Sequence, residues 1–299
     1  LTRFKNEIPE CTAPYTAPGL KSTQALPEFY QGATADYVKV DGKWVDGMAQ
    51  DNMLTALQNL QDAYTAGLID QEAITNTTSA CRDEWYAGTV GCFPYWGGLW
   101  GETLTVRLKQ NVPDAEVIAL PPIEGATYLY SAPSVQVISS KLSNEQVASV
   151  FKYFIEYMHD GGEGQVLFQS GVEGVHWQQS GDNIDPLPTI SKPAEPFRKA
   201  WITPWLALTP MTATNRNVEV SQEVTDSLAV VSANAKNISV FPVSEQRTMI
   251  TSDLTTAREN IISRVAMGQL TPEEGMAEYK AQAETLNVAQ ALEEMNANA

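Results

Sequence analysis

Apolar residues recur with the spacing of an α-helix in several parts of the chain. Asp51 is placed to cap the first of these helices, and Gly67 to end it. Ser143 and Gln146 match a capping box at the head of the most regular helix, and a shorter helix follows through residues 166–167. The predicted inward faces are Met53, Leu57, Leu60 and Tyr64; Leu104 and Leu108; Val147, Val150, Phe151, Phe154, Ile155 and Met158; and Leu254, Ala257, Ile261 and Val265.

Strand patterns are fewer and shorter. The segment DYVKVDGKWVDG alternates apolar and polar residues around Asp41-Gly42, which predicts a hairpin. The segment EVIALPP, residues 116–122, predicts a buried strand, and residues 128–130 and 135–138 predict two more. Residues 1–35 predict a short amphipathic opening followed by loops.

The last third of the chain begins with a proline-rich stretch. Residues 181–210 hold six prolines, which predicts a long surface connection with some helix. Gly268 then ends the helix that contains Leu254. Thr271-Pro272-Glu273-Glu274 supplies a cap, a proline and two acids at the start of a final helix that runs towards Asn296.

One aromatic stretch, residues 81–104, combines these signals. Residues 81–87 have helical spacing, Gly88 breaks the helix, and residues 90–93 suit a strand. Rings on a glycine-rich turn after a strand suit stacking against a sugar, although each ring alone also suits a core. The six aromatic residues of the stretch are Trp85, Tyr86, Phe93, Tyr95, Trp96 and Trp100.

The net charge of the chain argues against two classes of binding partner. The chain of 299 residues has 36 acidic and 19 basic side chains, a net charge of −17. Nucleic acid and anionic membrane surfaces are therefore poor partners. No apolar run approaches the about 20 residues that span a bilayer. The spacing of three cysteines and two histidines predicts no metal site, and Cys81 and Cys92 suit either a disulfide or free buried thiols.

We find no catalytic motif in the sequence. Ser149 and Lys152 match S-x-x-K, but the partner motifs of that chemistry are absent. Carboxylate pairs of the glycosidase type are defined by a distance in space, and no pattern among the acids selects one. We therefore predict no catalytic residue and no cofactor.

Several segments in order resemble one family. They are AGLIDQE, EWYAGTVGCFPYW, VIALPPIEG, the helix after KLSNEQ, SGVEGVHW and IISRVAMGQLTPEEGMAEYKAQAETLN, which together cover roughly residues 40–299. The chain resembles extracellular solute-binding protein family 1 of bacterial ABC importers, the group that includes maltose-binding protein. Its long lipoprotein subgroup from Gram-positive bacteria is the most similar.

The resemblance implies an α/β, helix-rich, two-lobed periplasmic-binding-protein-like fold of type II, with the ligand between the lobes. Residues 1–120 would form the first part of lobe 2, residues 121–171 would cross to lobe 1, and residues 172–299 would return to lobe 2. Family members begin with well over a hundred further residues of lobe 1. We therefore expect lobe 1 to be incomplete here, either cut away or supplied by a separate N-terminal fragment.

The resemblance also implies a function. It predicts a non-catalytic component that captures a carbohydrate, in the first place an oligosaccharide, for an ABC permease, at the cell surface as a lipoprotein or in the periplasm. A secreted carbohydrate-active enzyme or a carbohydrate-binding module without transport is the alternative, and a peptide-like ligand is a third. Trp96 stands where maltose-binding protein has a sugar-stacking tryptophan. His176 is expected either to hold its loop or to contact ligand. The predicted ligand-binding residues are Trp96, Tyr95, Trp100, Trp177, Glu173, His176, Trp201 and Trp205.

Overall fold

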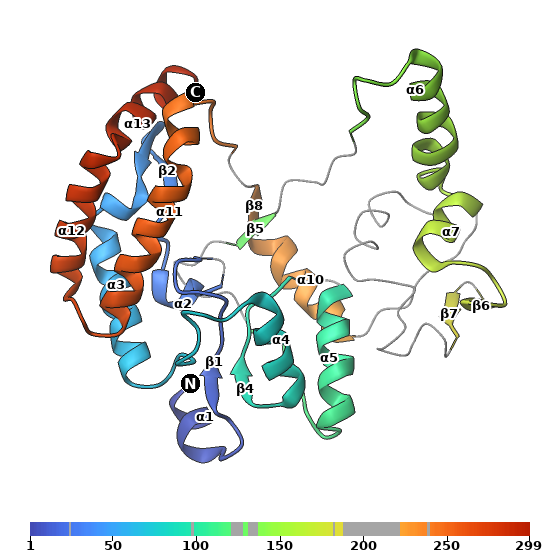
Figure 1. The fold of residues 1–299 in the computed structure, drawn as a ribbon. Coiled ribbons are helices and arrows are strands. Elements are labelled where there is room, and N and C mark those ends of the chain that lie inside the picture. The colour runs from blue at the N-terminus through green and yellow to red at the C-terminus, as the bar shows by residue number, and fades with distance from the viewer. Residues whose placement is uncertain are drawn as a thin grey trace. The chain divides into compact units, whose positions relative to one another are not determined.

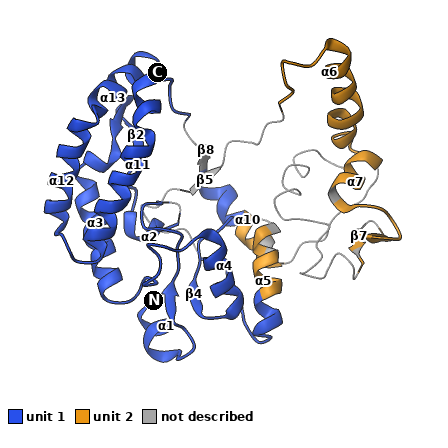
Figure 2. Ribbon diagram, viewed as in Figure 1, with its two compact units in different colours: residues 1–96, 108–130, 229–299 blue, residues 97–107, 131–228 orange. Residues whose placement is uncertain are grey.

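The computed structural model describes residues 1–23, 25–96, 99–120, 128–130, 137–181, 183–187, 222–237 and 240–299. The chain forms two compact units (Figure 2). Unit 1 comprises residues 1–96, 108–130 and 229–299, and unit 2 comprises residues 97–107 and 131–228. The assignment of chain segments to the two lobes of a solute-binding protein stays a prediction.

Unit 1 contains most of the described secondary structure (Figure 1). Two helices, α5 (Leu99–Asn111) and α10 (Gln222–Asn234), have residues in both units. The other elements of unit 1 are α1 (Thr2–Glu7), β1 (Ala13–Tyr15), α2 (Pro27–Tyr30), β2 (Tyr37–Val40), β3 (Lys43–Asp46), the 3₁₀-helix η1 (Gly47–Ala49), α3 (Asn52–Thr65), α4 (Thr78–Ala87), β4 (Val90–Cys92), β5 (Tyr128–Tyr130), β8 (Ala235–Asn237), α11 (Glu245–Ala266), α12 (Pro272–Thr285) and α13 (Val288–Ala297).

The core of unit 1 lies between α3 and the helices α11 to α13. The predicted inward residues Met53, Leu57 and Leu60 are fully buried, in one cluster with Leu254 and Ile261 of α11. Burying each such side chain contributes about 1.5–3 kcal/mol. This packing, rather than helix propensity, holds the four helices together.

The predicted hairpin is confirmed. Strands β2 and β3 pair antiparallel, with Val40 opposite Lys43. Asp41 and Gly42 both have positive φ, 49° and 80°, which the two-residue turn requires. The exposed backbone of β3 is covered from the C-terminal helix, because the Asn296 side chain donates to Trp44 O (2.9 Å) and accepts from Trp44 N (2.8 Å).

Two boundaries differ from the predictions, and one agrees. Asp51 precedes α3, but its side chain makes no capping hydrogen bond and its backbone is helical, at φ −62° and ψ −33°. The predicted final helix is two helices, because Asn287 adopts left-handed φ and ψ (56° and 45°) between α12 and α13. The predicted cap at Thr271 is present, and the structure adds a reciprocal bond from Glu274 that completes a capping box at the start of α12.

One predicted strand and one predicted loop also require correction. Residues 116–120 of EVIALPP form no strand, and Ile118 is 74% exposed, so this apolar run has no partner strand in the described structure. Residues 121 and 122 lie outside the described residues, as do residues 135 and 136 of the other predicted strand. Tyr128–Tyr130 is a strand as predicted and pairs parallel with β8. Residues 13–15, expected to be loop, form the buried strand β1.

Unit 2 has a small core in its described part. Its elements are α6 (Asn144–Val150), the π-helix η2 (Phe151–Glu156), α7 (Glu163–Ser170), β6 (Trp177–Ser180) and β7 (Asn183–Pro186). Strands β6 and β7 pair antiparallel. The buried apolar cluster of unit 2 comprises Val166, Trp177 and Ile184.

The predicted capping box of α6 is present, but the predicted burial of its apolar face is wrong. Ser143 Oγ accepts from Gln146 N, and the Gln146 side chain accepts from Ser143 N. Phe151 and Phe154, expected to point inward, are 54% and 49% exposed. The small described core of unit 2 offers too little apolar surface to cover them. Met158, at the end of this helical stretch, is buried as expected.

Candidate functional site

The aromatic stretch lies on the connection from α4 through β4. Thr77 Oγ1 accepts from Ala80 N (3.2 Å) at the start of α4, and Gly88 ends the helix at φ 75°. The chain then enters β4, which pairs parallel with β1, so that Val90 lies opposite Ala13. The predicted helix, glycine break and strand are therefore confirmed. Residues 93–96 follow the carboxyl end of a parallel strand pair, the end at which α/β folds bind ligands.

Three rings from α4 and the end of β4 form an aromatic column: Trp85, Phe93 and Tyr95. The ring centroids of Trp85 and Phe93 are 6.1 Å apart, and those of Phe93 and Tyr95 are 5.0 Å apart with an interplanar angle of 30°. All three residues are half-buried. Phe93 contacts both other rings, so its main contribution is to pack the column.

Arg82, one helical turn before Trp85, holds the end of the aromatic column. Its guanidinium carbon lies 6.0 Å from the centroid of the Tyr95 ring, and Nη1 donates to the Tyr95 hydroxyl (3.1 Å). Its Nη2 donates to Ser79 Oγ (2.9 Å). The sequence reasoning missed Arg82, although its i, i+3 spacing from Trp85 places both on one helix face.

Trp96, the residue after the column, offers the most open ring of the site. It is 57% exposed, whereas Tyr95 is half-buried. Trp100 is half-buried on α5 and belongs to unit 2. An exposed indole next to fixed rings has the apolar face that stacks on the C–H groups of a sugar.

The other predicted ligand residues belong to unit 2. Trp177 is 2% exposed, and its indole N–H donates to Gly171 O (2.8 Å). His176 Nδ1 accepts from Val172 N (2.9 Å), and His176 N donates to Val172 O (2.8 Å). Both side chains therefore hold the loop of residues 171–176, on which Glu173 is exposed. Trp201 and Trp205 lie outside the described residues.

The three cysteines are free thiols in the structure. Cys81 is fully buried on α4, and Cys92 is half-buried at the end of β4. Burial raises the pKa of both thiols above the ordinary value of 9.0. Both are therefore kept in the neutral, unreactive form at neutral pH.

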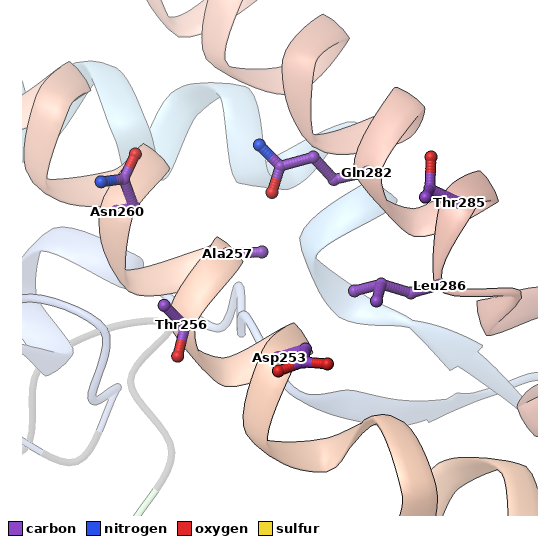
Figure 3. Close-up of a pocket in the computed structure, with 7 residues that line it drawn as sticks. All are labelled: Asp253, Thr256, Ala257, Asn260, Gln282, Thr285 and Leu286. Atoms are coloured by element: carbon purple, nitrogen blue, oxygen red, sulfur yellow. The ribbon is translucent and has the colours of Figure 1, made fainter.

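A groove lies elsewhere in unit 1, between α11 and α12 (Figure 3). Figure 3 shows Asp253, Thr256 and Asn260 on α11 and Gln282 and Thr285 on α12 around it. Ala257 and Leu286 complete the lining. Hydroxyl and amide groups gather there, but no aromatic ring is among the lining residues. The stretch after β4 remains the better candidate for binding a sugar.

Among the described residues, no three histidine, cysteine or acidic side chains come together in a way that would hold a metal ion. None of the described helices has the length and apolar character needed to cross a membrane.

Comparison with known proteins identifies the fold. No protein-family model matches the chain, and no curated protein matches it. Among solved structures, an alginate-binding protein, AlgQ2 without calcium ion, aligns with 99% of this chain at a TM-score of 0.66 and 16% identity. An HMO-binding, ABC-transporter-associated solute-binding protein from Bifidobacterium longum infantis aligns with 99% at a TM-score of 0.60 and 13% identity. The chain has the helix-rich α/β fold of two-lobed solute-binding proteins. It spans 65% and 67% of the lengths of these two proteins.

Proposed function

We propose that the protein is the substrate-binding component of an ABC importer and that it captures a carbohydrate, in the first place an oligosaccharide. The fold supports this proposal, because the two solved structures described above are an alginate-binding protein and an HMO-binding, ABC-transporter-associated solute-binding protein. In this proposal the two lobes of the fold close over the sugar and present a surface to the permease. The protein would act outside the membrane, as a lipoprotein at the cell surface or in the periplasm.

One observation carries the carbohydrate part of the proposal. Trp96 exposes 57% of its surface directly after the aromatic column, at the carboxyl end of the β1–β4 pair. The column fixes the chain on which Trp96 lies, so that stacking a sugar costs little ordering of the protein. Polar groups around the ring would accept hydrogen bonds from the sugar hydroxyls.

A glycosidase is less well supported by the carboxyl groups near the aromatic column. Asp70 and Glu84 are close enough to contact the same Thr16 hydroxyl oxygen, at 3.2 and 2.7 Å. Retaining and inverting glycosidases separate their two carboxyl groups by about 5 to 10 Å to admit a sugar or a water. This pair contacts a buried threonine instead of flanking an open space. We therefore propose a binding protein without catalytic activity.

Calorimetry against a panel of neutral and acidic oligosaccharides tests the proposal. We expect at least one glycan to bind and Trp96→Ala to weaken it tenfold or more, about 1.4 kcal/mol. Tyr153→Ala is the matched control, because Tyr153 is an aromatic residue 71% exposed on η2. Absence of binding to every glycan would refute the carbohydrate proposal. Equal affinities of the two variants would refute the role of Trp96.

A further inference from the structure

Two carboxyl groups contact the same threonine, and we call them the carboxyl pair: Asp70, from the loop after α3, and Glu84 of α4, the residue before Trp85. Both contact the hydroxyl oxygen of Thr16, which follows β1: Glu84 Oε2 at 2.7 Å and Asp70 Oδ2 at 3.2 Å. The Asn76 amide nitrogen donates to Asp70 Oδ2 (2.5 Å) and to Glu84 Oε1 (3.3 Å). The carboxyl pair is thus joined through two shared neutral side chains.

The carboxyl pair lacks one hydrogen when both groups are ionised. Thr16 has a single hydroxyl hydrogen and donates it to only one carboxylate at a time. The oxygen of the other carboxylate then faces a lone pair of Thr16 Oγ1. A proton on Glu84 supplies the missing hydrogen. Glu84 then donates to Thr16 Oγ1, and Thr16 donates to Asp70 Oδ2. Every contact in this chain then has a donor and an acceptor.

The surroundings favour that proton. Thr16 is fully buried, Asp70 is 9% exposed and Glu84 is half-buried. Burial raises the pKa of Glu84 above its ordinary value of 4.5, and the charge of Asp70 raises it further, although hydrogen bonds from Thr16 and Asn76 act in the opposite direction. Two further titratable groups lie near the pair, Cys81 of α4 and Tyr64 of α3; burial raises the pKa of each above its ordinary value, so both stay neutral. In the described part of the chain, no ion pair joins either carboxyl group to a lysine or arginine.

The carboxyl pair is connected to the residues that carry the aromatic column. Glu84 immediately precedes Trp85, and its carbonyl oxygen accepts from the Thr89 hydroxyl (3.1 Å) in the turn into β4. Thr16 N donates to Cys92 O (3.2 Å), one residue before Phe93. Asp70 N donates to Tyr15 O (2.8 Å) at the end of β1. A change in the pair therefore acts on α4, β1 and the end of β4 together.

We propose that Glu84 is a positioning residue for the aromatic site: its shared proton with Asp70 fixes α4 against β1, so that sugar is held more tightly at mildly acidic pH than at alkaline pH. The effect on sugar rests on the proposed function, whereas the shared proton does not. Loss of the proton leaves two negative charges against one hydroxyl. The resulting repulsion loosens α4 and with it the ring of Trp85.

Thermal unfolding without ligand tests the shared proton. Because the pKa of Glu84 is raised in the folded state, its stabilising contribution is complete below the ordinary value of 4.5 and is lost as the pH rises through the raised value. We expect the melting temperature of the unmodified protein to fall between about pH 5 and about pH 8. Glu84→Gln, whose amide N–H replaces the carboxyl hydrogen, loses this component. Asp83→Asn, which removes an exposed charge from the same helix, retains it.

Sugar affinity over the same pH range tests the positioning role. With a glycan that binds, we expect the affinity of the unmodified protein and of Asp83→Asn to fall about three- to tenfold over this range, and that of Glu84→Gln to stay constant at the higher level. Equal pH profiles of melting in the unmodified protein and Glu84→Gln would overturn the shared proton. If melting depends on pH as expected but sugar affinity does not, the positioning role is overturned. A protein that binds no glycan at any pH refutes the proposed function, while the melting profile still decides the shared proton.

Discussion

The guanidinium of Arg258 lies 2.7 Å from the carboxylate of Asp46, between Nη2 and Oδ1, although the two residues are 212 positions apart in the chain. Both side chains are almost fully buried, at 4% and 6% exposure. Arg258 Nε also donates to the Tyr279 hydroxyl (3.2 Å), which in turn donates to Asp46 Oδ2 (2.5 Å). The hairpin, α11 and α12 are thereby joined by one closed set of hydrogen bonds.

Removal of Arg258 is expected to leave a buried, unpaired carboxylate. We predict that Arg258→Ala lowers the free energy of unfolding by about 3–5 kcal/mol in urea denaturation. Glu259→Gln is the control on the same helix, because Glu259 pairs with Lys21 at the surface (3.5 Å) and should change stability by at most about 1 kcal/mol. Similar losses of unfolding free energy in both variants would show that the buried pair stabilises the fold no more than the surface pair does.

Phe93 is expected to affect sugar binding without offering its own ring to the ligand. Phe93→Ala removes the ring that contacts both Trp85 and Tyr95, so we predict a weaker sugar affinity and a changed tryptophan fluorescence spectrum in the free protein. Phe93→Leu keeps most of the volume and should lose less affinity. An affinity that is the same in all three proteins would mean that the column does not position Trp96.

A side chain at Gly91 is expected to destabilise the fold. A Cβ atom there would lie 2.6 Å from Phe4 Cγ and 2.8 Å from Pro14 O, between β4 and β1. We predict that Gly91→Ala costs about 1–3 kcal/mol of unfolding free energy. In the double variant Phe4→Ala with Gly91→Ala, the loss of stability should be smaller than the sum of the two single losses, because the Phe4 ring no longer clashes with the new Cβ. Additive losses would argue that the Pro14 carbonyl alone determines the cost.

Glu294 is expected to make stability depend on acid pH. Its Oε2 accepts from Gln246 N (3.0 Å) and Ser244 Oγ (2.8 Å) at the start of α11, and these bonds lower its pKa below the ordinary 4.5. A lowered carboxyl pKa stabilises the fold above the ordinary value, and this contribution is lost as the pH falls through the lowered value. Glu294→Gln should therefore melt earlier than the unmodified protein at neutral pH, and the difference should shrink below about pH 4.5. For the control Glu293→Gln, the difference in melting temperature from the unmodified protein should not change over this pH range.

The sequence predicted the features that depend on neighbouring residues. The Asp41-Gly42 turn, the capping box at Ser143, the cap at Thr271 and the break at Gly88 each involve a few consecutive positions, and all are present. Residues 13–15 were expected to be loop, because three residues carry too little pattern to reveal a strand whose partner lies near residue 90. Their burial comes entirely from that partner.

The candidate site was predictable to a similar extent. The aromatic composition and the glycine break marked the stretch around Trp96, and the structure confirms its place after β4. Asp70, by contrast, is buried against Thr16. No local pattern connects Asp70, Glu84 and Thr16, since their proximity arises from the pairing of β1 with β4. The predicted roles of Glu173 and His176 in ligand binding stay predictions.

The side-chain amide of Asn296 has a consequence for the behaviour of the protein in concentrated solution. By donating to and accepting from the backbone of Trp44, it takes the place of an additional strand along β3. An uncovered strand edge is a template for pairing with another molecule and hence for aggregation. The last turn of α13 therefore protects the hairpin from intermolecular pairing. Asn296→Ala would be expected to increase self-association before it lowers the thermal stability of the monomer.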